Sequence, residues 1–500
     1  MSTEGEIARE GLTDVASLCH VFLPGSVAVV GASRRPGSVG RAILHNIVTG
    51  GYQGKVYAIN PHAFRMEGIR CLPSVTALPQ PADLAVIAVP PAAVPAVADR
   101  CGRRGVSALA VITACLDALQ EADLLSICRR YGMRLVGPGS AGVAVPSIGL
   151  NATFTARHPE PGMVGLALQT SGLGLALTDR LSRLGLGISS FASLGSRCDV
   201  STNDMLRWWE QDETTRLAVL HVESVGNPRT FVRTARCVGA VMPVVALRPP
   251  SPAANKPATG TASTSPLVTL DELLEQAGVI AAENIVDVLA TAVLLVSQPV
   301  PAGRRVAVIS SVGAAADPAA EACSARGLIV ATMSARTRRQ LHALVPPGAV
   351  VTGPVDTTAA VSARSFRRCL ELVARDEGVD AVLAVVLPTA TNRDLATAVR
   401  AARVAVPLAA VILDQKENVR LLPGTADREP GHDPGPPGSV PAYCDPQIAA
   451  GALARAAAYG ARASRPVPGL SSLRQEEAQR HFPPIVTPGW RHRRPECAPG

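Results

Sequence analysis

Residues 26–50 have the sequence SVAVVGASRRPGSVGRAILHNIVTG, whose pattern identifies the first structural unit of the chain. The small and β-branched apolar residues at 26–30 predict a buried strand. The glycine-rich stretch 31–40 predicts a tight turn, and the segment 41–49 predicts a helix. In such a strand–turn–helix unit, the backbone N–H groups of the turn and of the helix start form a site for a phosphate.

The chain continues to alternate between strands and helices after this unit. Apolar strands are predicted at 55–59, 84–89 and 107–113, with helical segments between them. Nearly continuous apolar strands that alternate with helices indicate a parallel sheet covered on both faces. We therefore expect a Rossmann-like domain at residues 21–147, preceded by an N-terminal tail at residues 1–20.

Two further rounds of apolar strands and helices follow the first domain. They predict two flavodoxin-like, doubly wound domains at residues 148–300 and 301–465, which places the whole chain in the α/β class. A stretch rich in proline, serine and threonine at 248–266 is expected to be an exposed loop. Residues 466–500 show no pattern, and we expect them to form a poorly ordered tail.

The composition excludes several classes of protein. Hydrophobic residues make up 47% and charged residues 18% of the 500 residues, which excludes general disorder and fits about three domains. Aromatic residues make up only 3%, so stacking platforms for nucleic-acid bases are not expected. The net charge of +8 does not indicate a nucleic-acid partner, because the arginines are spread along the chain and their densest cluster, at 491–494, lies in the tail.

The sequence also argues against a membrane protein and a metal protein. No apolar stretch is long enough to cross a membrane, and the first ten residues carry acids where a signal peptide needs cations, so we expect a cytoplasmic protein. The eleven cysteines include no C-x-x-C pair and no cluster with histidines. We therefore expect neither a metal site nor a disulfide framework.

The turn after the first strand suggests which phosphate ligand the first domain holds. It lacks the G-x-G-x-x-G pattern, and the second strand ends at Asn60 and Pro61 instead of an acid, which disfavours NAD. Arg34 and Arg35 lie within the turn and would suit a ligand with several phosphates. The alternative is that these two arginines are merely solvated.

Residues 27–75, which run from VAVVGASRRPGSVG through YAINPHAF to RCLPSV, are followed by PADLAVIAVPPAAV. This sequence resembles the CoA-binding domain of NDP-forming (ADP-forming) acyl-CoA synthetases, the group that includes the succinyl-CoA synthetase α subunit. The later segments LVGPGSAGVAVP, LALQTSGLGLAL and FASLGSRCDVSTND are similar to further motifs of the same family, in the family's order. The resemblance covers about residues 20–460.

The resemblance implies two binding sites. CoA or an acyl-CoA would bind at the first turn and at the ends of the neighbouring strands, on Gly31, Ala32, Ser33, Arg34, Val39, Gly40, Asn60, Pro90 and Thr113. The start of a later helix would bind an anion through Gln169, Thr170, Ser171, Gly172 and Gly174. For the glycines, ordinary tight-turn geometry is the alternative interpretation.

The family's chemistry passes through a phosphorylated histidine in an A-A-x-S-H-T-G motif. The corresponding segment here, at 253–260, is A-A-N-K-P-A-T-G, so Ala258 stands at the position of the histidine. Glu223 matches the family's catalytic glutamate that holds the phosphohistidine, and we expect it to be vestigial. The nearest histidine, His221, is expected to lie in a strand and to point away from a loop nucleophile.

Three functional hypotheses remain open. The first is a CoA- or acyl-CoA-binding protein, regulatory or a partner subunit, since the family's ATP-grasp domain does not fit into the 35 residues after 465. The second is an active acyl-CoA synthetase (acid-thiol ligase) subunit that works with a separate ATP-grasp chain. That chain would bind the NDP or ATP. The third and weaker one is an NAD(P)-binding Rossmann protein. The resemblance also implies an oligomer and, as partner, an ATP-grasp subunit or an acetyltransferase.

Overall fold

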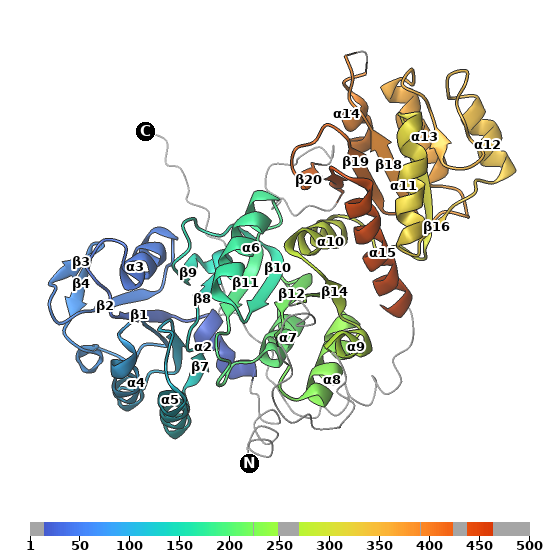
Figure 1. Cartoon of the computed structure of the whole chain (residues 1–500). Coiled ribbons are helices and arrows are strands. Elements are labelled where there is room, and N and C mark those ends of the chain that lie inside the picture. Colours follow the sequence, from blue (N-terminus) through green and yellow to red (C-terminus); the bar gives the residue numbers. More distant parts are fainter. Residues whose placement is uncertain (1–14, 224, 249–269, 391, 424–437, 464–500) are drawn as a thin grey trace, which may run out of the picture.

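The computed structural model describes residues 15–223, 225–248, 270–390, 392–423 and 438–463. Within these residues the chain forms three seven-stranded sheets, each with helices packed against it (Figure 1). Most neighbouring strands run parallel, and antiparallel pairs are found at the edges of the sheets. The predicted α/β class with a Rossmann-like first unit is confirmed.

The first sheet has the strand order β3-β4-β2-β1-β5-β6-β7. The chain winds from β1 to one side and then returns to β5 on the other, so the winding reverses between β1 and β5. The strands are β1 (Ser26–Val30), β2 (Lys55–Ile59), β3 (Arg65–Met66), β4 (Ile69–Leu72), β5 (Leu84–Ile87), β6 (Ala108–Val111) and β7 (Arg134–Val136). The connecting helices are α3 (Val39–Thr49), η2 (Val75–Ala77), η3 (Pro91–Ala93), α4 (Val94–Arg103) and α5 (Ala118–Tyr131).

The second sheet has the order β14-β13-β12-β10-β11-β8-β9, and its winding reverses between β10 and β12. The strands are β8 (Gly142–Val145), β9 (Leu150–Thr153), β10 (Pro161–Leu168), β11 (Ile188–Ser193), β12 (Leu217–His221), β13 (Val244–Leu247) and β14 (Ile280–Ala282). The helices are η4 (Pro146–Ile148), α6 (Ser171–Arg183), α7 (Thr202–Gln211), α8 (Pro228–Gly239), α9 (Leu270–Gln276) and α10 (Ile285–Ser297). The predicted domain boundary at residue 147 therefore falls after the first strand of this sheet.

The third sheet has the order β16-β15-β18-β19-β21-β20, and β17 pairs with β15. The strands are β15 (Arg305–Ser310), β16 (Ile329–Val330), β17 (Val355–Asp356), β18 (Ala381–Val386), β19 (Leu408–Ile412), β20 (Val419–Leu422) and β21 (Val440–Tyr443). The helices are α11 (Gly313–Ala325), α12 (Ala335–His342), α13 (Ala363–Val373), α14 (Leu395–Arg400) and α15 (Pro446–Ala463).

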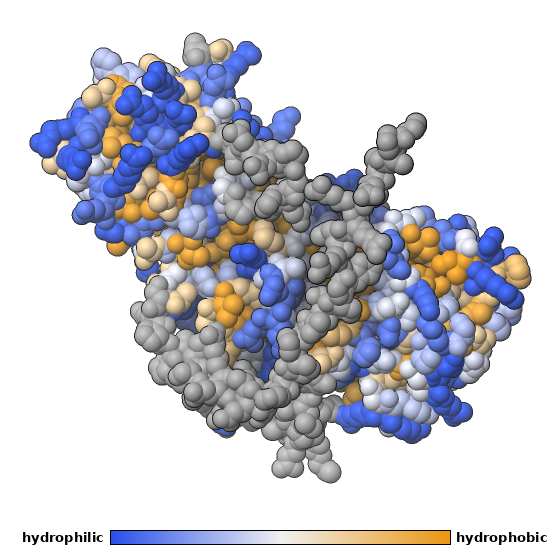
Figure 2. Space-filling model, turned by 180° about the vertical axis from the view of Figure 1, so that it is seen from behind, coloured by the Kyte–Doolittle hydropathy of each residue, from blue (hydrophilic) through white to orange (hydrophobic). Residues whose placement is uncertain are grey.

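No helix in the described ranges is long and apolar enough to cross a membrane. On the face of the molecule shown in Figure 2, hydrophilic side chains are spread over the surface of the described residues.

The two faces of the second sheet belong to two different hydrophobic cores. Ala167 of β10 packs in a cluster that also contains Val27 and Val29 of the first sheet. Its neighbours Leu166 and Leu168 point to the other face and pack in a cluster that continues into the third sheet. Because side chains alternate along a strand, a single apolar strand joins all three domains.

The N-terminal prediction needs a correction. Residues 15–20, which the sequence placed in a tail, begin two helical turns, η1 (Val15–Leu18) and α2 (Cys19–Phe22), whose Leu18 and Phe22 are fully buried. The ring of Phe22 lies 5.2 Å from that of Trp208 in the second domain. This segment was missed because it is too short to show periodicity, and tertiary packing holds it in place. The predicted tail at 466–500 lies outside the described residues, as does nearly all of the predicted loop at 248–266.

Arg134 of β7 forms a buried ion cluster between the first two domains. Its Nε lies 2.9 Å from the carboxylate of Asp199, its Nη2 lies 3.0 Å from that of Asp204, and its Nη1 donates to Ser17 Oγ at 2.7 Å. Burial alone would lower the pKa of Arg134, but the two carboxylates outweigh burial and raise it. Asp204 also closes the capping box of α7 by accepting from the backbone N–H of Ser201 at 2.8 Å.

This cluster predicts a large loss of stability for Arg134→Met. The side chain of Asp204 is only 4% exposed, so removing the cation leaves a buried charge without its partner, which costs about 3–5 kcal/mol. The midpoint of urea-induced unfolding should fall accordingly. Arg157→Met is the control, because the side chain of Arg157 is 68% exposed and its ion pair should contribute less than about 1 kcal/mol. Equal midpoints for the two variants would contradict this account of the cluster.

Candidate functional site

The turn after β1 brings two backbone segments into direct contact. Gly31 has a φ of +92°, and a Cβ placed on it would lie 2.3 Å from the carbonyl oxygen of Ala88. A Cβ on Gly40 would lie 2.2 Å from the carbonyl oxygen of Gly31. Only glycine fits at both positions, so the start of α3 can pack directly against the end of β1.

The end of β2 is tied to this turn by polar contacts. Asn60 donates from Nδ2 to the carbonyl oxygen of Ala32 at 2.6 Å and accepts the N–H of His62 on its Oδ1 at 2.7 Å. Arg34 donates from Nη2 to the carbonyl oxygen of His62 at 3.3 Å, while Ser33 Oγ accepts the N–H of Arg35 at 3.1 Å. The predicted residues Ala32, Ser33, Arg34 and Asn60 therefore form one connected group.

The remaining predicted residues of the first domain lie at the same edge of the sheet. Val39 opens α3 and is 40% exposed. Pro90 follows β5 and precedes the turn η3, and Thr113 follows β6 and donates from its hydroxyl to the carbonyl oxygen of Val89 at 2.6 Å. This is the carboxyl edge at which the winding of the sheet reverses, where open α/β sheets bind their ligands.

The predicted anion site lies at the start of α6 in the second domain. Thr170 is the N-cap residue and Ser171 the first helical residue. A Cβ on Gly174 would lie 2.8 Å from the ring of Phe191, so helix-to-sheet packing alone explains this glycine. A Cβ on Gly172 would meet nothing within 4 Å, so packing does not explain why this position is a glycine.

A single residue, Gly139, connects the two predicted sites. Its N–H donates to the carbonyl oxygen of Thr113 at 2.9 Å, and its own carbonyl oxygen accepts the hydroxyl of Ser171 at 2.8 Å. The N–H of Ser196 donates to the carbonyl oxygen of Pro138 at 2.9 Å and holds the same segment from the second domain. The carboxyl edge of the first sheet and the start of α6 therefore meet at the interface between the two domains.

His221, the last residue of β12, lies next to the start of α6. Its Nδ1 lies 3.2 Å from the hydroxyl of Thr170, and the residue is only 6% exposed. Burial lowers the pKa of His221, and the charge of Glu223 opposes this shift. The N–H of Glu223 donates to Gln169 Oε1 at 2.8 Å, which ties the predicted glutamate to the residue before Thr170.

The structure thus places a histidine, His221, beside the predicted anion site. The sequence offered one signal for it, because His221 lies two residues before Glu223, which was already a predicted site residue. Ala258 lies outside the described residues, so the expectation that His221 points away from a nucleophile on that loop stays untested. Among the described residues, no cluster of His, Cys, Asp or Glu could hold a metal ion.

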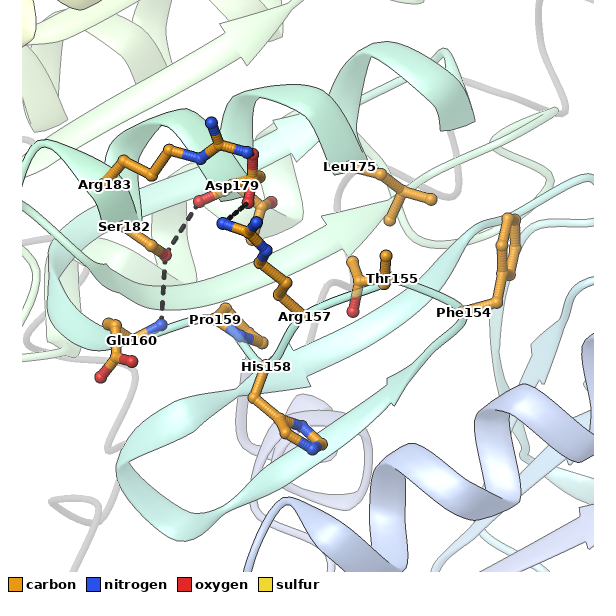
Figure 3. A pocket seen from close by; sticks show the side chains of 12 residues that line it. Phe154, Thr155, Arg157, His158, Pro159, Glu160, Leu175, Asp179, Ser182 and Arg183 are labelled. Atoms are coloured by element: carbon orange, nitrogen blue, oxygen red, sulfur yellow. Dashed lines mark hydrogen bonds and ion pairs between the residues drawn. The ribbon is translucent and has the colours of Figure 1, made fainter.

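A separate cavity of about 560 Å³ lies towards the other end of α6 (Figure 3). It lies between the loop before β10 and the last two turns of the helix, and none of the predicted site residues lines it. Arg157 and Arg183 point into it from opposite sides, and both pair with Asp179, at 3.8 and 2.7 Å. The charge of the two arginines is thus partly neutralised within the cavity.

Comparisons with known families match the first two domains. Residues 25–146 match a family described as CoA binding domain. Residues 161–295 match one described as succinyl-CoA ligase like flavodoxin domain. These matches confirm the predicted combination of a Rossmann-like CoA-binding domain and a flavodoxin-like domain.

Comparisons with individual proteins extend over all three domains. The chain is 30% identical over 388 residues to the acetate–CoA ligase [ADP-forming] II subunit alpha of Pyrococcus furiosus, covering 74% of this chain and 83% of that subunit. It is 34% identical over 385 residues, 74% of this chain, to the acetate–CoA ligase [ADP-forming] I of Archaeoglobus fulgidus, but spans only 55% of that protein. Among solved structures, it superposes with a TM-score of 0.76 and 26% identity on the dinucleotide forming acetyl-coenzyme A synthetase 1 of Ca. Korarchaeum cryptofilum, covering 89% of this chain and 97% of that one.

The buried position of His221 predicts a specific dependence of stability on pH. Since its pKa is lowered in the folded state, the unfolded chain binds more protons at this residue, and stability falls as the pH drops below about 6.5. In His221→Asn the amide can keep the contact with Thr170 but does not titrate. Its urea midpoint should therefore fall less than that of the unmodified protein between pH 7.5 and pH 5.5.

His342→Asn is the matched control, because His342 lies exposed on α12. This variant should show the same pH dependence as the unmodified protein. If His221→Asn also follows the unmodified protein at both pH values, the burial of His221 does not determine its protonation.

Proposed function

Since the chain belongs to the ADP-forming acyl-CoA synthetase family, we propose that it is an α-type CoA- or acyl-CoA-binding chain that does not relay a phosphoryl group through residue 258. In this proposal it acts as a regulatory protein or as a partner subunit. The observation that carries it is the contact through Gly139, which joins the edge bearing Thr113 to the helix start at Ser171. A long ligand anchored at the first turn can extend along this contact to the second domain.

The first turn suits the diphosphate of CoA. The backbone packing at Gly31 and Gly40 leaves no side chains between the end of β1 and the start of α3, so N–H groups can approach a phosphate. Arg34 adds a positive charge within the turn, held in place by its bond to His62. Asn60 lies at the end of β2, the position at which Rossmann-like domains contact the ribose.

The start of α6 suits a separate anion, or the end of the ligand that lies opposite to the diphosphate. Thr170 and Ser171 provide hydroxyls there, and the helix dipole favours negative charge. The position of the family's phosphorylated histidine holds Ala258, whose methyl group cannot accept a phosphoryl group. We therefore propose that nucleotide chemistry is carried out by a separate ATP-grasp subunit, or that CoA binding regulates a partner such as an acetyltransferase.

Calorimetric titration with CoA and acetyl-CoA tests the binding proposal. The unmodified chain should bind at least one of the two, and replacing both Arg34 and Arg35 by Ala should weaken binding about 10- to 100-fold, since charge-assisted hydrogen bonds are lost. The variant Gly31→Val should not bind, because its side chain meets the carbonyl of Ala88. Arg157→Ala in the separate cavity serves as control and should bind normally. A flat titration with the unmodified chain would overturn the proposal.

Incubation with acetyl phosphate and CoA tests the absence of catalysis. Thioester formation from these two compounds needs only attack of the CoA thiol on the acetyl carbon, with inorganic phosphate as the leaving group, and therefore no acceptor at residue 258. Because we propose binding without catalysis, the unmodified chain should form no acetyl-CoA above background. In Ala258→His, acid-labile phosphate should become attached to the protein if the rest of the site is intact. Thioester formation by the unmodified chain would instead support the hypothesis of an active synthetase subunit.

A further inference from the structure

Phe64 is an exposed aromatic residue whose ring does not pack in a hydrophobic core of the described residues. It is 79% exposed, in the loop that leaves the end of β2, and it belongs to none of the hydrophobic clusters of the described residues. The chain has only seven phenylalanines, and the Phe residues at 22, 191, 231 and 366 are fully buried. An apolar ring of this size contributes to stability when it is buried, so the exposed ring of Phe64 is left free to contact a ligand.

The surroundings of Phe64 carry positive charge. The guanidinium of Arg70 on β4 lies 5.8 Å from the centre of the ring. The carbonyl oxygen of Phe64 accepts the N–H of Cys71 at 2.9 Å, which fixes its backbone against β4. The nearest acid along the hairpin, Glu67, is already engaged by Arg41 at 3.6 Å and by His45 at 3.0 Å.

Arg34 links this group to the first turn. Its guanidinium bonds to the carbonyl oxygen of His62, two residues before Phe64. The guanidinium of Arg41 in turn donates to the carbonyl oxygen of Arg34 at 3.1 Å. Two guanidinium groups, one aromatic ring and the phosphate-binding turn are therefore neighbours at the end of β2.

The order of these groups matches the order of groups in a nucleotide. With the diphosphate at the turn after β1 and the ribose at the end of β2, the base lies beyond that end, where residues 61–64 leave the sheet. We propose that Phe64 stacks against the adenine of CoA and that Arg70 binds the 3′-phosphate of its ribose. This proposal rests on the proposed function and adds how the chain selects CoA over dephospho-CoA, which lacks the 3′-phosphate.

Titration with three ligands tests the proposal: CoA, dephospho-CoA and 4′-phosphopantetheine, which lacks adenosine. The unmodified chain should bind CoA about tenfold more tightly than dephospho-CoA, as expected for a phosphate held by arginine. Phe64→Ala should weaken CoA and dephospho-CoA alike by about tenfold or more, the usual effect of losing an aromatic stacking partner. The same variant should bind 4′-phosphopantetheine as the unmodified chain does.

A second variant separates the base from the phosphate. Arg70→Gln should lose the preference for CoA over dephospho-CoA while its affinity for dephospho-CoA stays unchanged. Phe64→Trp should retain the affinity for CoA, because tryptophan also offers a stacking face. Leu119→Ala is the matched control, since Leu119 on α5 of the same domain is likewise 79% exposed and apolar.

The outcomes distinguish this inference from the proposed function. If the unmodified chain binds none of the CoA ligands, the proposed function itself fails. If it binds CoA but Phe64→Ala binds CoA equally well, only the stacking role of Phe64 is overturned. A loss of 4′-phosphopantetheine binding in Phe64→Ala would also overturn it, because that effect could not come from the base.

Discussion

The ion cluster around Arg134 determines how the first two sheets meet. Its guanidinium comes from the last strand of the first sheet, while Asp199 and Asp204 come from the loop before α7 and from α7 itself. Asp199 also accepts the backbone N–H of Leu135 at 2.8 Å, so the carboxylate holds both the side chain and the strand. The segment that follows β7 then reaches Gly139, where the two predicted sites are joined. Any ligand that uses both sites depends on this orientation of the sheets.

Local sequence patterns predicted the parts of the fold and site that local geometry decides. The close backbone packing at Gly31 and Gly40 could be predicted, because a strand, a tight turn and a helix in direct succession leave no room for a Cβ. The assignment of Asn60 to the CoA site came only from the resemblance to the acyl-CoA synthetase family. Arg134 and Gly139 could not be predicted, because their partners lie up to 70 residues away and only tertiary packing brings them together. The same holds for the helical turns at residues 15–22, whose burial depends on Trp208.

The start of α6 keeps an ordered set of polar groups although residue 258 is an alanine. Thr170 contacts His221, Ser171 contacts Gly139, and Glu223 is tied to Gln169. Each of these contacts also has a structural role, since together they connect α6 to the ends of β12 and to the first domain. In the proposed function, the groups of this predicted anion site keep their role in the fold although the phosphoryl relay is lost. The preserved geometry by itself does not argue for a preserved reaction.

The arrangement of the cores has a consequence for how the molecule comes apart. The first and third sheets each have one face with a hydrophobic cluster of its own, whereas both faces of the second sheet are shared with a neighbour. The helices of the second domain cover most of both faces of its sheet, but removal of either neighbour would still expose part of a shared cluster to water. Loss of its strands would open both shared clusters at once and release the other two sheets together. Unfolding of this chain should be governed by its centre, with the three sheets acting as one cooperative unit.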